Sequence, residues 1–424
     1  MKMQLTALAA AVGFAVSGAT FAQQTITEKN DLLYNSTTLP AQGGGWGVDN
    51  KNSGLDNDAW TDNNTSPFIE YSNLERNSEF DGFQNELTTG MTGSTASGNE
   101  SVIDQTTNLS STTGNVASVL QGNGTNNQSL VVQNKQGTGD ALSAYVDQSG
   151  DNNVSNVKQD LSYGAIANVS QDGTANQARI EQLGADLNSA EIQQTGINHK
   201  SIIEQGILNG GATGNVAWSE QSGSTNQSFI KQGRQNNYAE AKQHGTDGSN
   251  MMRQRGDDNV AVLDQTGQSN YSYVYQDSRP NFDGNSADIT QSGSNNVSDA
   301  DQAGGGNDVT VSQTGNDALS TIYQRGTGNT ADVDQSGGFD ASNILQFGDG
   351  HQAFVKQLGD GIYNTLNESH ILQNGSGSHF ADVTQTHVGS GWNNISTITQ
   401  NSSVNASATV KQTGSGNRAS TIQY

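Results

Sequence analysis

The sequence predicts an all-β fold, a parallel β-solenoid built from two sheets. Three observations predict it: a unit that recurs mostly every 11 residues, a period of two within that unit, and glycine or asparagine after it. The unit reads Asn-x-Ala/Ser-x-Val/Ile-x-Gln-x-Gly and occurs 27 times between residue 99 and the last residue. Two facing strands per turn bury each other's inner face, which gives 22-residue coils and about 13 of them.

Each strand is located by the side chains that precede its glutamine. Val or Ile stands two residues before it in 21 of 27 units, Ala or Ser four before in 25, and Asn six before in 18. Successive side chains of a strand point to opposite faces, so all of these lie on one face. The following Gly or Asn supplies the positive φ of a tight turn. We therefore expect a strand of about six or seven residues and a short arc in each unit.

Equivalent residues of successive coils stack, so the repeated amides form ladders. Asn and Gln side chains both donate and accept hydrogen bonds and can satisfy one another along such a stack. The free-energy cost of an unpaired buried amide exceeds the gain from a paired one. A shifted register would leave many amides unpaired, so one register of the coils is favoured. We assign this structural ladder role to Gln171, Asn176, Gln182, Gln254, Asn259, Gln265, Gln324, Asn329, Gln335, Gln412, Asn417 and Gln423.

Composition limits the other function classes. The 424 residues are 31% hydrophobic and carry a net charge of −24, values typical of disorder, yet they include only three prolines. The absence of cysteine excludes disulfides and thiol-based metal sites. The acidity argues against nucleic-acid binding, which needs a basic surface. The repeat predicts order from residue 99 onward.

Three segments are expected. Residues 1–22 read as a secretory signal peptide, with Lys2, an apolar run from Leu5 to Val16, and a cleavage site after Ala22. Residues 23–98 form a Gly/Asn/Asp-rich segment, expected to be flexible, which serves either in secretion targeting or as a cap. Residues 99–424 are the repeat region.

We expect no catalytic, cofactor-binding or metal-binding residue, and therefore no enzyme. The carboxylates fall mostly on outward or loop positions, and a thin two-sheet core offers no cleft for an acid/base pair. Three of the six histidines, His199, His351 and His379, occupy the Asn position of the repeat and lack metal-ligand spacing.

A few of the gaps between successive glutamines are distinctly longer than the others. They follow Gln105, Gln133, Gln205, Gln276, Gln357 and Gln385. The first four follow odd-numbered units and the last two follow even-numbered ones. Strict alternation of the strands between two sheets therefore places the first four enlarged arcs at one edge and the last two at the other.

The repeat resembles that of the curlin family, Ser-x5-Gln-x4-Asn-x5-Gln. Two instances are Gln171–Asn176–Gln182 and Gln254–Asn259–Gln265, and the ending from Asn417 to Tyr424 is similar to that of major curlin subunits. The resemblance implies a secreted subunit of extracellular amyloid fibres on the bacterial surface, used in biofilm matrix and adhesion. It also implies an outer-membrane secretion pore, a periplasmic chaperone and a nucleator subunit as partners.

The residues alone also predict polymerisation. A solenoid ends in unpaired strand edges, which template another chain, and head-to-tail addition gives a filament stacked as cross-β. The alternative is a monomeric or surface-tethered solenoid adhesin whose stack is capped by residues 23–98. A nucleator variant of the same family is a third reading.

Overall fold

The computed structural model describes residues 98–107, 114–135, 140–206, 212–278, 283–359, 367–389 and 393–424. These residues form strands, turns and bends, and none of them lies in a helix that could cross a membrane. They fall into two compact units, 98–250 and 251–424, with the division inside β15 (Ser249–Arg255). The expected signal peptide and all but the last residue of segment 23–98 lie outside the described residues.

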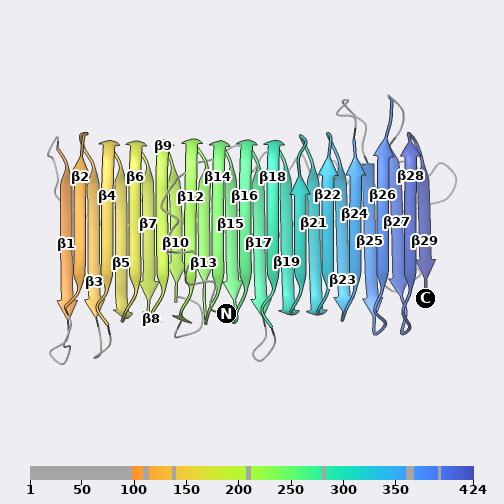
Figure 1. Ribbon diagram of the computed structural model, residues 1–424, viewed down its shortest axis with the longest axis horizontal. Coiled ribbons are helices and arrows are strands. Elements are labelled where there is room, and N and C mark those ends of the chain that lie inside the picture. The colour runs from red at the N-terminus through yellow and green to blue at the C-terminus, as the bar shows by residue number, and fades with distance from the viewer. Residues whose placement is uncertain are drawn as a thin grey trace, which may run out of the picture. The chain divides into compact units, whose positions relative to one another are not determined.

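The first unit is a two-sheet parallel β-solenoid. Its long strands alternate between sheet A and sheet B along the chain, and the strands of the two sheets run in opposite directions (Figure 1). Sheet A contains β1 (Glu100–Thr107), β3 (Gln128–Lys135), β5 (Val154–Ser162), β7 (Gln177–Leu183), β10 (Lys200–Gln205) and β13 (Gln227–Gln232). Sheet B contains β2 (Val116–Gly122), β4 (Ser143–Asp151), β6 (Ile166–Thr174), β9 (Ser189–Ile197), β12 (Val216–Ser224) and β14 (Tyr238–Thr246).

The second unit has the same architecture, and its strands likewise alternate between two parallel sheets. Sheet A contains β17 (Tyr271–Ser278), β19 (Val297–Gly305), β21 (Leu319–Thr327), β23 (Ala341–Gly348), β25 (Asn367–Gly375), β27 (Asn394–Asn401) and β29 (Arg418–Gln423). Sheet B contains β16 (Val260–Gln268), β18 (Ser286–Ser294), β20 (Asp308–Gln313), β22 (Thr330–Ser336), β24 (Gln352–Leu358), β26 (Phe380–His387) and β28 (Ser407–Gly414).

The predicted fold class is therefore confirmed in each unit. Six strands per sheet in the first unit and seven in the second agree with the expected number of about 13 coils. Coil length varies along the stack. The coil from Gln221 to its partner Gln243 has the predicted length, whereas the coil from Gln357 to its partner Gln385 is longer. The glutamines stay aligned because the extra residues are accommodated in the arcs.

Strict alternation places the enlarged arcs as expected. In the first unit, all three long gaps follow strands of sheet A, namely β1, β3 and β10. In the second unit one follows β17 of sheet A and two follow β24 and β26 of sheet B. Most of the inserted residues lie outside the described residues. The position of each enlarged arc is therefore inferred from the strands that flank it.

Some arcs also pair between coils, which the sequence did not predict. In the first unit β8 (Ala185–Asp186) and β11 (Ala212–Thr213) form a short parallel sheet of their own. In the second unit Asn316 makes parallel bridges to Ser294 and Gly338. Stacked coils therefore hold the arcs in register as well as the strands.

The core of each unit is the narrow layer between its two sheets. In the first unit Val157, Ile180 and Ile203 of sheet A and Val169 and Ile192 of sheet B are buried. Burial of such a side chain contributes roughly 1.5–3 kcal/mol, and β-branched residues suit the pleated surface.

The outer faces of the two sheets differ. Strands of sheet B alternate between buried and partly exposed residues, as in β14 and β22. In the inner strands of sheet A the side chains of both faces are mostly buried, and β13 is buried at all six residues, whereas the end strands β1 and β29 are exposed or half-buried. Glu181 and Lys231 point away from the core and are nevertheless buried.

Candidate assembly surface

A ladder of glutamine side chains lines one margin of each inner face. Gln171 of β6 accepts a hydrogen bond from Gln148 Nε2 at 2.7 Å and donates its own Nε2 to Gln194 Oε1 at 2.6 Å. The same Nε2 also donates to the backbone oxygen of Val154 in sheet A, 3.1 Å away. Each glutamine therefore links successive coils and ties the two sheets together.

In the asparagine ladder, the side-chain oxygen and the side-chain nitrogen both bind backbone groups. The backbone N–H of Asn176 donates to Asn153 Oδ1 at 3.1 Å, and Asn176 Oδ1 accepts from the backbone N–H of His199 at 3.1 Å. Its Nδ2 donates to the backbone oxygen of Gly196, also at 3.1 Å. The side chain thus satisfies the turn backbone, which explains why Asn precedes most of the strands.

These ladders coincide with the segments recognised by comparison with protein families. The model of the curlin associated repeat matches residues 167–196 and 283–315, one segment in each unit. Two segments of the chain therefore carry the curlin associated repeat. A comparison with curated proteins finds no match.

The other residues assigned to the curlin-repeat ladder lie at equivalent places. Gln182 donates to Gln205 at 2.9 Å, Gln254 to Gln276 at 2.9 Å, Gln265 to Gln291 at 2.6 Å, Gln324 to Gln346 at 2.8 Å and Gln335 to Gln357 at 2.8 Å. Asn259 accepts from the backbone of Asn285 at 3.0 Å, and the backbone N–H groups of Asn329 and Asn417 donate to Asn307 and Asn394, each at 3.1 Å. These residues form several short stretches of ladder rather than one cluster.

Histidine replaces the curlin-repeat asparagine with matching hydrogen bonds. The backbone N–H of His379 donates to His351 Nδ1 at 3.2 Å, so the ring nitrogen takes the place of the amide oxygen. His351 Nε2 lies 3.1 Å from the backbone oxygen of Phe347, four residues earlier, where Asn Nδ2 lies in other coils. Burial lowers the pKa of His351, and it lowers the pKa of His199 to about 3, which keeps these rings neutral.

Sequence reasoning missed that the Ala/Ser position distinguishes the two sheets. Ser129, Ser155 and Ser201 stand on sheet A, whereas Ala144 and Ala167 stand at the equivalent place on sheet B. The signal is present in the sequence, because Ser at this position falls only on odd-numbered units and Ala mostly on even-numbered ones. The small side chains keep the facing sheets of the curlin repeat close together.

The ladders have a direction that leaves different groups at their two ends. In the first unit Gln105 Nε2 donates to Gln133, and its Oε1 has no ladder donor among the described residues. In the second unit Gln412 and Gln423 accept from Gln385 and Gln400 at 2.7 and 2.8 Å, and they find no later ladder acceptor in the described part of the chain.

The strand edges at these ends are also open. β1 pairs only with β3 in sheet A, and β29 pairs only with β27, among the described strands. The residues of β29 are exposed or half-buried throughout. An edge with its backbone groups and amide ladder presented to solvent is a template for a further strand.

Proposed function

We propose that this protein is a structural, non-catalytic subunit of extracellular curli-like amyloid fibres that grow by end-to-end templating. The curlin repeat and the parallel two-sheet solenoid support this role. The single observation that carries it is the continuation of the register-matched ladder to the open edge strand β29, where Gln423 still accepts from Gln400 at 2.8 Å. A second copy that pairs its Gln ladder with this edge extends both sheets without a change of register.

The biological setting is proposed from the curlin resemblance. The fibres would form part of a biofilm matrix and serve adhesion and cell aggregation on the bacterial surface. The subunit would be secreted with its signal peptide removed, through an outer-membrane pore, after a periplasmic chaperone has kept it unfolded. A nucleator subunit would start the fibre.

A pair of variants on β29 tests templating at this edge. Ala419 lies at an inward position, paired with the buried Ser396 of β27, whereas Ser420 next to it points outward. An inward charge at an edge strand opposes further strand pairing, so Ala419→Lys should lower the rate of seeded elongation by about tenfold or more. Ser420→Lys adds the same charge to the outer face and should elongate at nearly the native rate.

The measurement is dye-binding fibre growth of residues 23–424, diluted from denaturant onto native seeds. Equal elongation of both variants would show that β29 is not a growing edge. A native chain that stays a folded monomer in the presence of seeds would overturn the fibre role and favour the adhesin capped by residues 23–98.

A further inference from the structure

The first and the last coil of the stack both end in a step. At the C-terminal end, β28 of sheet B is followed by β29 of sheet A, and each is the last described strand of its sheet. At the N-terminal end, β1 is the first described strand of sheet A, and β2, which follows it, is the first of sheet B. Strands two apart in the chain are one coil apart, so β29 lies about half a coil beyond β28, and β1 about half a coil before β2.

These steps allow a second copy to join in two ways. If β1 of the second copy pairs with β28, then β2 falls one coil beyond β29, and both sheets continue at the usual strand spacing of about 4.8 Å. If β1 pairs with β29 instead, β2 falls two coils beyond β28, and one strand is missing from that sheet. A missing strand leaves backbone N–H and C=O groups without partners on both sides of the gap. The alternation of the strands therefore favours pairing of β1 with β28 and of β2 with β29.

Apolar side chains on the outer faces match in this arrangement. Alignment of the glutamine ladders places Leu120 of β2 beside Ile422 of β29, because both directly precede a ladder glutamine. Leu120 is 61% exposed and Ile422 is 40% exposed in the single chain. Stacking of one on the other removes apolar surface of both side chains from water, which favours this joint.

The inner faces of the two ends match as well. Ile103 of β1 points inward but is 44% exposed, since no described strand lies before β1 in its sheet. At the joint of β1 with β28 it stacks on the inward Val410, a β-branched residue on another. Ala419 of β29 stands where most strands of sheet A carry Ser, and it meets Ala117 of β2. The last strand of sheet A thus has the small residue that is typical of sheet B.

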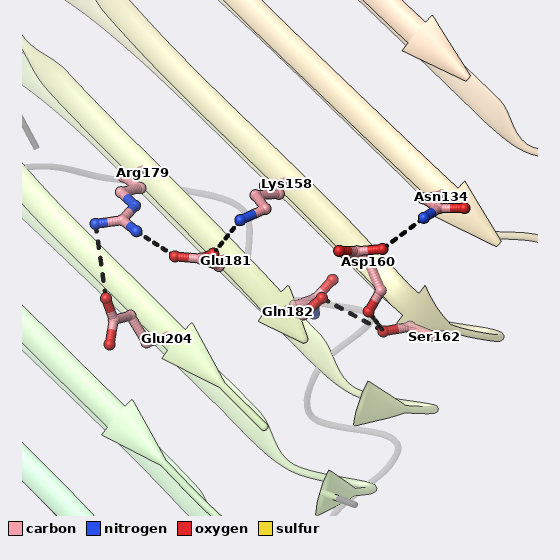
Figure 2. A network of polar contacts seen from close by, with 8 residues as sticks. All are labelled: Asn134, Lys158, Asp160, Ser162, Arg179, Glu181, Gln182 and Glu204. Carbon is pink, nitrogen blue, oxygen red and sulfur yellow. Dashed lines mark hydrogen bonds and ion pairs between the residues drawn. The ribbon is translucent and has the colours of Figure 1, made fainter. Parts of the chain in front are cut away.

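Charged residues directly before the ladder glutamine pair between neighbouring strands inside the first unit. Figure 2 shows Lys158 of β5 bound to Glu181 of β7, at 2.8 Å, and the two are partners in register. Lys231 of β13 likewise lies 2.9 Å from its register partner, Glu204 of β10. Opposite charges at this position therefore bridge successive coils.

The two ends of the chain carry such a pair divided between them. Asp104 of β1 and Lys411 of β28 both precede a ladder glutamine and are exposed, and neither forms an ion pair with another described residue. Pairing of β1 with β28 sets them side by side. The other joint sets Asp104 beside the apolar Ile422 and leaves Lys411 next to the missing strand.

The amide ladder favours the same joint. Ladder glutamines also donate Nε2 to the backbone oxygen of the first residue of the preceding strand, as Gln423 does to Ser407 at 2.9 Å. Gln105 follows no described strand, and its Nε2 donates to Gln133 alone among the described residues. When β1 pairs with β28, the strand that precedes β1 in the stack is β29. The backbone oxygen of Arg418, its first residue, then takes the place that Ser407 has for Gln423.

We propose that successive copies join with β1 of one copy paired to β28 of the other and β2 paired to β29. Sheet A of one copy then continues sheet B of the other, and sheet B continues sheet A. Asp104 pairs with Lys411 across the joint, and Leu120 packs on Ile422. The inference rests on the proposed fibre function and specifies which strands meet.

Paired cysteines test the joint directly in fibres of residues 23–424, because the native chain contains no cysteine. Neighbouring strands are about 4.8 Å apart, which lies within the Cα separation of disulfides. Fibres of Leu120→Cys/Ile422→Cys, grown under reducing conditions and then oxidised, should dissolve into disulfide-linked multimers. Asp104→Cys/Ile422→Cys is the matched control, because these positions meet only in the other joint, and its fibres should dissolve into monomers.

The outcomes separate this joint from the proposed function. Multimers from the control pair, or from neither pair, would overturn the joint although fibres still form. A native chain that forms no fibres would instead overturn the proposed function.

An exchange of charges gives a second readout without a new covalent bond. Lys411→Asp should slow self-seeded elongation at low salt by about threefold, because it sets two carboxylates side by side, and Lys411→Asp/Asp104→Lys should restore the native rate. Arg418→Glu changes the net charge by the same amount but should elongate at nearly the native rate. Arg418 meets Val116 in the proposed joint and Glu100 in the other one, so slowing by Arg418→Glu alone would assign the other joint.

Discussion

The imidazole rings of His351 and His379 stack face to face, with centroids 4.8 Å apart and planes 2° apart. One coil separates them, and His379 donates its backbone N–H to His351 Nδ1 at 3.2 Å. Each Nε2 lies near a backbone oxygen, of Phe347 at 3.1 Å and of Asn374 at 3.0 Å. For His351, only a neutral ring with its proton on Nε2 satisfies both contacts.

The buried ladder histidines should make the protein acid-sensitive. Burial lowers the pKa of His351, and that of His199 to about 3, below the value of about 6.5 in the unfolded chain. Between these values the unfolded state binds more protons, so stability is complete above about pH 6.5 and falls as the pH falls. For His199 the loss should be about 2 kcal/mol at pH 5.

Urea unfolding at pH 7 and pH 5 measures this loss. His199→Asn and His351→Asn restore the common ladder residue and should each remove part of the pH dependence, with little change at pH 7. A change in unfolding free energy between pH 7 and pH 5 that is the same in the variants as in the native protein would show that these histidines do not contribute to it.

Two glutamines of strand β24 should respond very differently to substitution. Gln357 is buried, accepts from Gln335 at 2.8 Å and donates to Gln385 and the backbone oxygen of Ala341, each at 2.9 Å. Gln357→Leu leaves these partners unpaired and should destabilise the protein by about 2–4 kcal/mol. Gln352 on the same strand is exposed, and Gln352→Leu should change stability by less than about 0.5 kcal/mol.

Urea midpoints of the two variants, at matched protein concentration, give the comparison. Similar small losses of stability in both variants would mean that the hydrogen bonds of the amide ladder add little to stability beyond the packing of the side chains.

The sequence predicted the part of the fold that repeats. Gln171 and Asn176 were identified by spacing alone, because a stack of coils turns a periodic sequence into a periodic structure. The difference between the two sheets could also have been predicted from the sequence. Ser and Ala alternate at the same position of successive units, as in Ser155 and Ala167, just as the strands alternate between the sheets. The inner face is thus specified locally, residue by residue.

The burial of one outer face could not be predicted in this way. Lys231 of sheet A and Lys242 of sheet B occupy equivalent outward positions in the repeat, yet the first is buried and the second is half-buried. Outward residues vary from coil to coil, and their exposure depends on whether something outside the repeat covers the sheet. A repeat pattern contains no information about such a cover.

A buried carboxyl pair on β19 should oppose the histidine effect over much of the same pH range. Burial raises the pKa of Asp301 to about 7, with Asp277 adding to the rise and Arg325 opposing it, and burial raises the pKa of Asp299 well above its usual value. The folded state therefore binds more protons than the unfolded state between about pH 4 and 7, and stability falls as pH rises through that window.

Asp301→Asn keeps the shape of the side chain and removes the charge. It should flatten the pH dependence between about pH 4 and 7 and stabilise the protein at pH 8 by on the order of 4 kcal/mol, measured by urea unfolding. A variant that is less stable than the native protein at every pH would instead indicate a charged Asp301 held favourably by Arg325.

Two glycines of one turn in the second unit differ in what a side chain would meet. Gly326 has a φ of +132°, and a Cβ on it would overlap the carbonyl oxygen of Gly348 in the next coil. Gly328 has a φ of +65°, and a Cβ there would meet open space. At the place of Gly328 other coils carry Asn152 or Asn295, with φ of 60° and 57°.

Gly326→Ala should therefore cost about 3 kcal/mol, because backbone strain adds to an overlap with backbone that cannot move without shifting a coil. Gly328→Ala should cost only about 1 kcal/mol, from the left-handed backbone alone, and Gly328→Asn should be nearly neutral. Urea midpoints of the three variants test this order. Equal losses for the two alanine variants would mean that turn flexibility, and not the close stacking of coils, selects glycine at these positions.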